Sequence, residues 1–546
     1  MRLLSTLILF VLAAPAVMAG ETAEPVTAFF PKRAKIALRL PSLDRLDAIA
    51  LQVHPFVQMV DRDAAASMRR LPLSATVIHG LGLDAEDPFD RTRPMFVTFD
   101  FLTEENMLFL PIEPGSRWVP RELKDEKTGE VRGDYLCIAK EALLALETRG
   151  RATPFLGGDV GIKVYIAELA DENRTLIEVG LAKLLEELAG APLGAIDARK
   201  LSAAVGSLAR DSMYGVESLD YTFTWKQGQL HSQGILRVRD GAPLRGFIGR
   251  AGTPGENPLI GYLPKSSFLV MDAVSNPDWP GKEISQFAAA ALGDEVGAPV
   301  SRAILSNSHI WDKLTGRMAV SVDLGAVLGM PTSISIVEGK PDADLDAAFA
   351  KLDTAGITAA VRKLGLDFDL QLERAVETYN TVAIHKMTTK IAIPMPGMPA
   401  GGAQTQTSCV AVVNNLMLTA SGLDPMGSIK RLIDRVQKGE TVEHPHAKAI
   451  QDLGERRHNL AFSINIGGFK PFAMIFMLAG VPDVAQAIAS LPDEVYITTV
   501  VSVWEGHLHW RGSWPVKEAV KIADRVIKAQ EARELAAQAA MEEDFE

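Results

Sequence analysis

The sequence has too little cysteine for a covalently braced fold. Cys137 and Cys409 are its two cysteines in 546 residues, and they lie far apart. A scaffold of several disulfides is therefore excluded. One bridge stays open if the chain is exported, but two buried free thiols are the favoured interpretation. The fold must depend on apolar burial, for which a composition that is 47% hydrophobic is ordinary.

Long apolar runs are missing after the N-terminus. The stretch 472–481 is too short to cross a membrane, which takes about 20 residues, and it predicts a buried helix. The N-terminus itself has Arg2, an apolar run over 3–14 and the small-residue pattern Val-Met-Ala over 17–19. This pattern is typical of a secretory signal peptide over 1–19. We therefore expect export to the periplasm or the extracellular space.

Positive charge is also in short supply. The chain has 56 basic and 68 acidic residues, which gives a net charge of −12. Attraction of nucleic acid or of an anionic membrane by bulk charge is thus excluded. A local, peripheral contact with a membrane or with another envelope protein stays open.

Familiar catalytic and cofactor motifs are absent. The sequence has no G-x-S-x-G elbow, no P-loop and no complete G-x-G-x-x-G, so no cofactor is predicted. Ser421 and Gly422 precede Asp424 in the pattern of a strand-to-helix turn, which argues against an activated serine. An enzyme is not excluded, because catalytic groups can converge from distant positions.

The clearest positive feature is a hairpin pattern that occurs twice, over 221–238 and 496–514. Its turns lead into Gly-Gln-Leu-His-Ser-Gln-Gly and Gly-His-Leu-His-Trp-Arg-Gly. Period-two alternation predicts antiparallel strands with leucines and tryptophans in the core. His231, His507 and His509 fall on the opposite, wet face, where a surface role is favoured over ligand binding.

Other elements recur in the same order, so we predict an internal duplication. The fold class is α+β, with two tandem similar units, each an antiparallel sheet with helices packed on one face, plus a C-terminal helix. The first unit covers 26–250 and the second 261–515, joined by a Gly/Pro-rich linker over 251–260. The C-terminal helix and an acidic tail cover 516–546.

Two clusters are candidate sites. Glu440, Glu443, His444 and His446 could together bind a divalent metal, although the segment also reads as a solvated polar loop. Met395 and Met398 lie in a proline-rich loop over 393–402 between two predicted strands. They could contact a partner or a lipid, or the loop could fold back on its own domain.

The pattern resembles secreted bacterial proteins grouped as a domain of unknown function. The similar features are Leu-Pro at 40–41 and at 263–264, the segment 347–352 followed by Tyr379 and Ile384, and the strand-to-helix passage over 416–439. The resemblance implies export and a duplicated α+β build. It brings no catalytic residues.

We therefore predict an exported, non-catalytic envelope protein that acts as a binding or scaffold module. One alternative is a hydrolase or metal-dependent enzyme whose site is assembled from scattered residues. Another is a carrier of a hydrophobic ligand held between sheet and helices. Converging His, Asp or Glu side chains in a deep pocket would favour the enzyme, and an empty apolar space would favour the carrier.

Overall fold

The computed structural model describes residues 21–23, 25–60, 66, 72–84, 86–100, 105–116, 118, 122–123, 127–150, 154–324, 331–392, 404–454, 456–478, 480 and 482–543. The predicted signal peptide lies outside the described residues, as do Met395 and Met398. The predicted mixture of helices and antiparallel strands is confirmed. No helix within the described ranges has the length and apolar character needed to cross a membrane.

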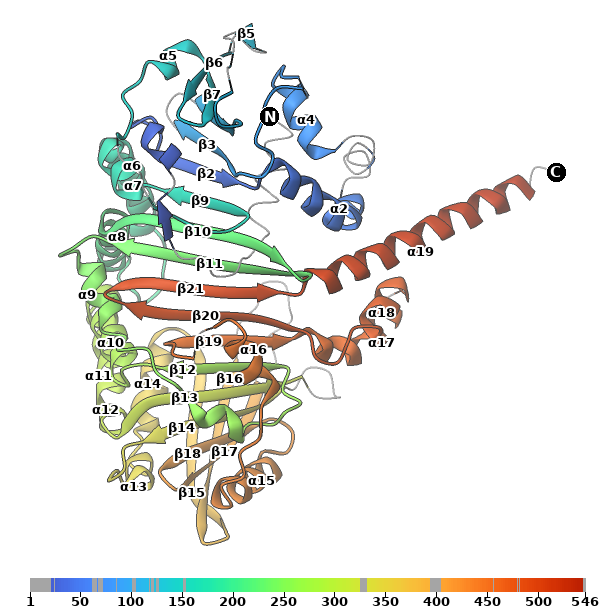
Figure 1. Cartoon of the computed structure of the whole chain (residues 1–546). Coiled ribbons are helices and arrows are strands. Elements are labelled where there is room, and N and C mark those ends of the chain that lie inside the picture. Colours follow the sequence, from blue (N-terminus) through green and yellow to red (C-terminus); the bar gives the residue numbers. More distant parts are fainter. Residues whose placement is uncertain are drawn as a thin grey trace.

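One long antiparallel sheet runs through most of the molecule (Figure 1). Its earlier strands are β2 (Ile36–Leu40), β3 (Met95–Asp100), β4 (Glu105–Pro111), β5 (Glu122–Leu123), β6 (Lys127–Arg132), β7 (Tyr135–Ala139), β9 (Val160–Val164), β10 (Val216–Lys226) and β11 (Gln229–Val238). Its later strands are β12 (Leu269–Val274), β13 (Leu314–Asp323), β14 (Thr332–Gly339), β15 (Asp367–Tyr379), β16 (Val382–Ala392), β17 (Gln404–Val413), β18 (Leu416–Ser421), β19 (Leu460–Asn465), β20 (Tyr496–Trp504) and β21 (His507–Trp514). A separate pair consists of β1 (Glu21–Ala23) and β8 (Pro154–Leu156).

Successive pairings fix the order of neighbouring strands. From β11 the order runs through β10, β9, β2, β3, β4, β7 and β6 to β5. From β21 it runs through β20, β19, β12, β13, β14, β18, β17 and β16 to β15. β11 and β21 pair with each other, so both series belong to one sheet.

The two predicted hairpins lie side by side at the centre of this sheet. In the β11–β21 pairing, Gln233 is opposite Arg511 and Leu236 is opposite Leu508. Gln227, Gly228, Glu505 and Gly506 all have positive φ, as the polar-Gly turns predict. The expectation of a separate sheet in each unit is thus wrong. The edge strand of each hairpin carries unpaired backbone groups, and pairing the two edges satisfies both.

Helices surround the sheet on several sides. They are α2 (Leu43–Val60), α4 (Leu73–Gly80), α5 (Glu141–Leu144), α6 (Ile166–Glu172), α7 (Arg174–Ala189), α8 (Ala198–Gly215), α9 (Pro243–Gly249), α10 (Trp279–Ala291), α11 (Gly297–Ser306), α12 (Ser308–Trp311), α13 (Leu345–Phe349), α14 (Thr354–Lys363), α15 (Pro425–Gln437), α16 (Pro445–Gln451), α17 (Ala473–Leu478), α18 (Pro482–Ala489) and α19 (Val516–Glu543). Three 3₁₀ helices are η1 (Pro25–Phe29), η3 (Pro258–Tyr262) and η4 (Ile466–Phe472).

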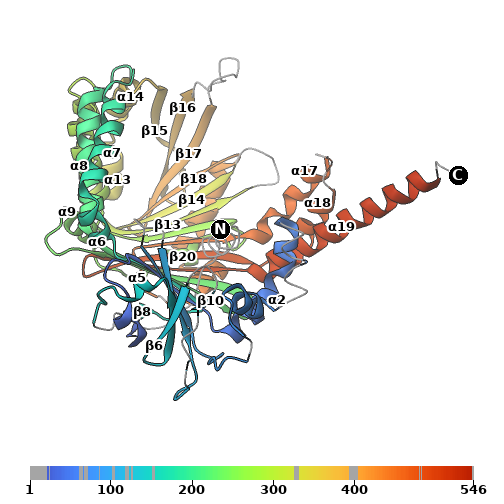
Figure 2. The same cartoon turned by 90° about the horizontal axis from the view of Figure 1, so that it is seen from above.

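A row of helices stands along one side of the sheet. α6 contacts β10, and the row continues through α8, α10 and α11 to α14, which contacts β15. Figure 2 shows this row on the side toward which β15, β16 and β17 curl. The row therefore connects a central strand to the last strand of the sheet.

Capping residues explain where several helices begin. Asp424 accepts a hydrogen bond from the backbone N–H of Gly427, and Pro425 occupies the first turn of α15, as predicted. Asp197 caps α8 in the same way. Two predictions fail. α2 continues through Pro55, because packing against α4 and α19 compensates for the lost hydrogen bond. α17, predicted to be buried, exposes its apolar side chains.

The three largest apolar clusters of the described residues hold the sheet and helices together. The largest joins β12, β13, β14, β17 and β18 to α15, α16 and η3. The other two lie on opposite faces of the earlier strands: η1 and α5 cover one face, and α2 and α4 cover the other. Cys137 and Cys409 are free thiols inside these cores, as predicted.

The central pairing can be tested at Gly234. A Cβ atom there would lie 2.0 Å from Cζ2 of Trp510 on β21. We expect Gly234→Ala to lower the free energy of unfolding by about 1–3 kcal/mol, because the indole must shift. Urea unfolding followed by tryptophan fluorescence measures this. Gly180→Ala is the control, since its Cβ would have no neighbour within 4 Å. An equal change in the free energy of unfolding for both variants would contradict close packing between β11 and β21.

Candidate functional site

On β13 and β19, burial is the reverse of what side-chain size suggests. On β19, Ala461 and Ser463 are fully buried, whereas Phe462 between them is 36% exposed. On β13, Ala319 and Ser321 are buried, and the larger valines and methionine that alternate with them are only half-buried. Large apolar side chains normally occupy the buried positions of a strand. Here they lie on the more accessible face.

Strand register places these large side chains on one continuous surface. Met271 is opposite both Phe462 and Val320, and Val501 is opposite both Leu460 and Trp510. We call this surface the apolar sheet face. Its half-buried or exposed members are Leu269, Met271, Met318, Val320, Val322, Val337, Met417, Leu460, Phe462, Ile464, Ile497, Val501 and Trp510.

The reverse side of the same strands is the covered one. Val270, Ala319, Ala461 and Val500 pack there against residues of α15, α16 and η3 in the largest core. Small side chains on this side allow the helices to approach closely. Within the described part of the chain, these three elements therefore cover the side opposite the apolar sheet face.

In the earlier half, the same face of the sheet is buried. Successive strand pairings place Trp510 opposite Gly234, Gly234 opposite Tyr221, Tyr221 opposite Ile162, and Ile162 opposite Leu38, so all of these residues lie on this face. Its continuation on β2, β3, β4 and β7 packs beneath α2 and α4. Among the described residues, the more accessible part of this apolar face therefore belongs to the later half.

The helix row adds further apolar side chains. α10 exposes Ile284 and Phe287, and α11 exposes Leu305. Removing such surfaces from water contributes about 25 cal/mol per Å². The three methionines of the face are flexible and can adapt to differently shaped apolar partners. The arrangement suits contact with an apolar molecule.

The predicted metal cluster does not come together. His444 and His446 are buried, whereas Glu440 and Glu443 are exposed. The histidine Nε2 atoms lie 2.8 Å from the backbone oxygens of Pro264 and Ser267. The solvated-loop interpretation is therefore wrong for the histidines, which fasten the start of α16 to the chain before β12. Across the described residues, no group of three or more His, Cys, Asp or Glu could hold a metal.

A further buried histidine, His458, forms an acid–base pair. His458 Nε2 lies 2.8 Å from Asp272 Oδ2, and Asn257 also donates to this carboxylate. Burial raises the pKa of Asp272, and the bond to His458 opposes that rise. Both side chains are almost completely inaccessible, so the pair joins β12 to the segment before β19 and cannot meet a substrate.

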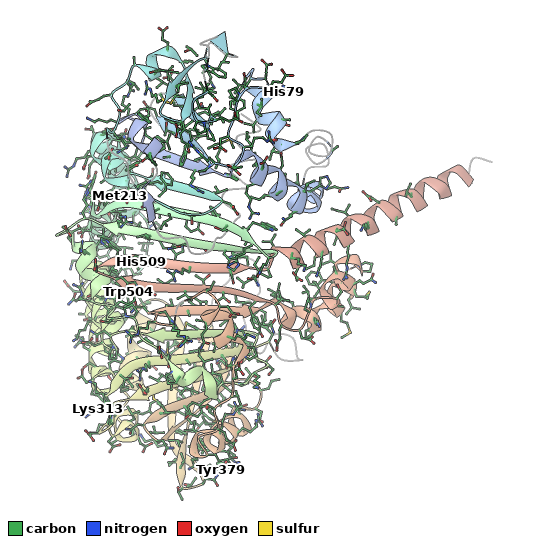
Figure 3. The ribbon with its side chains drawn as sticks, viewed as in Figure 1. His79, Met213, Lys313, Tyr379, Trp504 and His509 are labelled. Carbon is green, nitrogen blue, oxygen red and sulfur yellow. The ribbon has the colours of Figure 1, made fainter. Side chains whose placement is uncertain are left out.

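The hairpin histidines lie near the middle of the sheet, as Figure 3 shows for His509. His231, His507 and His509 are half-buried on the side opposite the apolar sheet face. Burial lowers the pKa of His231 to about 4 and lowers the pKa values of His507 and His509. These three histidines are less exposed to solvent than predicted. Trp514, predicted to lie in the core, is exposed.

The two thiols and a surface depression on α7 and α8 are further candidates for reactive groups. Burial raises the pKa of Cys137 to about 12 and also raises the pKa of Cys409, which disfavours the nucleophilic thiolate. A shallow, open depression lies on α7 and α8, where Arg210 donates to Glu178 at 2.9 Å. Arg174 and Thr175 also line this depression.

Sequence reasoning missed the apolar sheet face although a signal was present. Strands such as Leu-Ala-Phe-Ser-Ile over 460–464 alternate large apolar with small residues. Alternation identifies two faces, but it assigns the larger side chains to the core. Only the positions of α15, α16 and η3 reveal that the small residues are the covered ones.

His446 should make stability depend on pH. Burial lowers its pKa from 6.5 to about 4, so the unfolded chain takes up a proton first as the pH falls. The stabilising contribution is complete above pH 6.5 and is lost between pH 6.5 and 4, by roughly 3 kcal/mol. Urea unfolding at several pH values should show a shallower decline for His446→Gln. The exposed His79, labelled in Figure 3, supplies the control His79→Gln; equal slopes for the two variants would contradict the assignment.

Comparison with known proteins adds no assignment. No protein-family model, curated protein or solved structure matches the chain. The resemblance to secreted proteins of unknown function stays a prediction. The geometry of the apolar sheet face must therefore carry the functional argument.

Proposed function

We propose that the protein binds an elongated apolar molecule, such as the acyl chain of a lipid, along the apolar sheet face. The observation that carries this proposal is the reversed burial: Phe462 is accessible while Ala461 and Ser463 are buried. A surface that only faced water would gain nothing from large apolar side chains. A bound acyl chain would complete their burial.

The extent of the face favours an elongated ligand. It crosses the neighbouring strands β21, β20, β19, β12 and β13, and it reaches β14 at Val337 and β18 at Met417, beside Ser335 and Thr419. Strands about 4.8 Å apart make this roughly 30 Å. Contact along such a path offers many weak apolar interactions and few hydrogen bonds, which is the recognition that an acyl chain needs.

The proposal specifies the binding module predicted from the sequence and adopts its hydrophobic-carrier alternative. Export through the N-terminal signal remains part of the proposal and would place the protein where envelope lipids must cross water. The Asp272–His458 pair is sealed from solvent, and Glu440 and Glu443 lie exposed, apart from the buried His444 and His446, so neither group supports the enzyme alternative.

We also infer that the molecule consists of two related units. On each side of the β11–β21 pairing, the neighbouring strands come from corresponding places in the chain order. β10 corresponds to β20, β9 to β19, β2 to β12, and β3 to β13. Gln233 pairs with Arg511, its counterpart in the two hairpin sequences. Self-matching pairs of this kind are typical of a two-fold interface. The earlier unit would then be the covered copy and the later unit the binding copy.

Charge on the apolar sheet face should abolish ligand binding. We expect Phe462→Glu to weaken the binding of a fluorescent long-chain fatty acid at least tenfold, or about 1.4 kcal/mol, because a carboxylate would be desolvated against the chain. Fluorescence titration of the purified protein measures the dissociation constant.

Leu51→Glu is the matched control, because Leu51 is also an exposed apolar residue but lies on α2. Its affinity should equal that of the unchanged protein. Equal affinity of Phe462→Glu and Leu51→Glu would refute the proposal, provided that both unfold at the same urea concentration as the unchanged protein.

A further inference from the structure

A second accessible apolar surface lies at one end of the sheet. It consists of Phe469, Met474, Phe476, Met477 and Leu478, on η4 and α17, and we call it the α17 patch. Met474 is 71% exposed and Leu478 is 83% exposed. In Figure 1, α17 and α18 lie at the end of β19 and β20, below the start of α19.

The α17 patch follows the β19 part of the apolar sheet face along the chain. β19 carries Leu460, Phe462 and Ile464 of that face, and η4 follows it directly. The ring of Phe469 packs edge-on against Phe268, with centroids 4.9 Å apart, and Phe268 immediately precedes β12. The α17 patch therefore lies just beyond the end of β19, the strand that carries Phe462.

The patch is uncharged as well as apolar, which suits contact with the hydrocarbon region of a bilayer. No charged residue occurs between Pro471 and Pro482. Lys470, at the boundary, pairs with Asp493. With a net charge of −12 on the whole chain, electrostatic attraction to an anionic surface is disfavoured. Insertion of apolar side chains into a neutral lipid surface does not require it.

The patch is too small for a stable protein interface. Stable interfaces use roughly 20–30 residues on each side, whereas the patch has five large apolar side chains among the described residues. Shallow membrane insertion needs fewer contacts, since each buried CH₂ group contributes about 0.8 kcal/mol. A helix of six residues is about 9 Å long and fits within one leaflet.

We propose that the α17 patch inserts reversibly into a neutral lipid surface, so that acyl chains move between the bilayer and the apolar sheet face. This inference rests on the proposed function, for which it supplies the docking element. The partner is the bilayer itself, and the ligand is a chain drawn from it.

Flotation with phosphatidylcholine vesicles tests the docking step. The unchanged full-length protein should float with the vesicles, and Met474→Glu with Leu478→Glu should reduce the bound fraction at least fivefold. The matched control is Leu176→Glu with Leu184→Glu, which charges two exposed leucines on α7. That control should float like the unchanged protein.

The same variants also undergo the fatty-acid titration, which separates docking from ligand binding. Loss of flotation with normal fatty-acid affinity supports the inference. Unchanged flotation of the α17 variant, or no flotation of the unchanged protein, overturns it and leaves the proposed function standing if Phe462→Glu loses the fatty acid. Sedimentation that shows a dimer dissociated by the α17 substitutions also overturns it, since the patch would then bind a second copy.

Discussion

Backbone pairing between β11 and β21 is the contact on which the rest of the structure depends. It joins strands that are remote in sequence through seven opposed residue pairs, from Leu230 with Trp514 to Leu236 with Leu508. Without it, the chain would have two sheets, each with an unsatisfied edge at its hairpin. With it, one sheet face extends from the α2–α4 cover to the apolar sheet face. The seam therefore fixes the position of the covered half relative to the open half.

The two halves use similar strands but different covers. In the earlier half, α2 and α4 bury one sheet face while η1 and α5 bury the other. In the later half, α15, α16 and η3 bury one face, and the helix row connects to the sheet at β10 and β15. A face that is closed in one half and more accessible in the other would provide the proposed binding surface without altering the strand framework.

Local features were predictable because neighbouring residues determine them. Asp424 and Pro425 specify the start of α15, and the polar-Gly turns specify both hairpins. The seam was not predictable, because either hairpin edge could pair with many strands. The burial of His444 and His446 also escaped prediction, since their partners are backbone oxygens about 180 residues away. The apolar sheet face required knowledge of which side the helices cover.

The distribution of small residues makes the open face a consequence of packing on its reverse side. Ala319, Ala461 and Ser463 let α15, α16 and η3 approach the sheet, so those helices fill the buried side with their own apolar residues. The remaining hydrophobic volume of the strands, including Phe462 and Met271, must then point the other way. Stability alone would be served by polar residues there, because antiparallel sheets commonly keep one wet face. Large, flexible apolar side chains at these positions instead leave hydrophobic contact incomplete in the isolated chain, and an acyl chain would complete it.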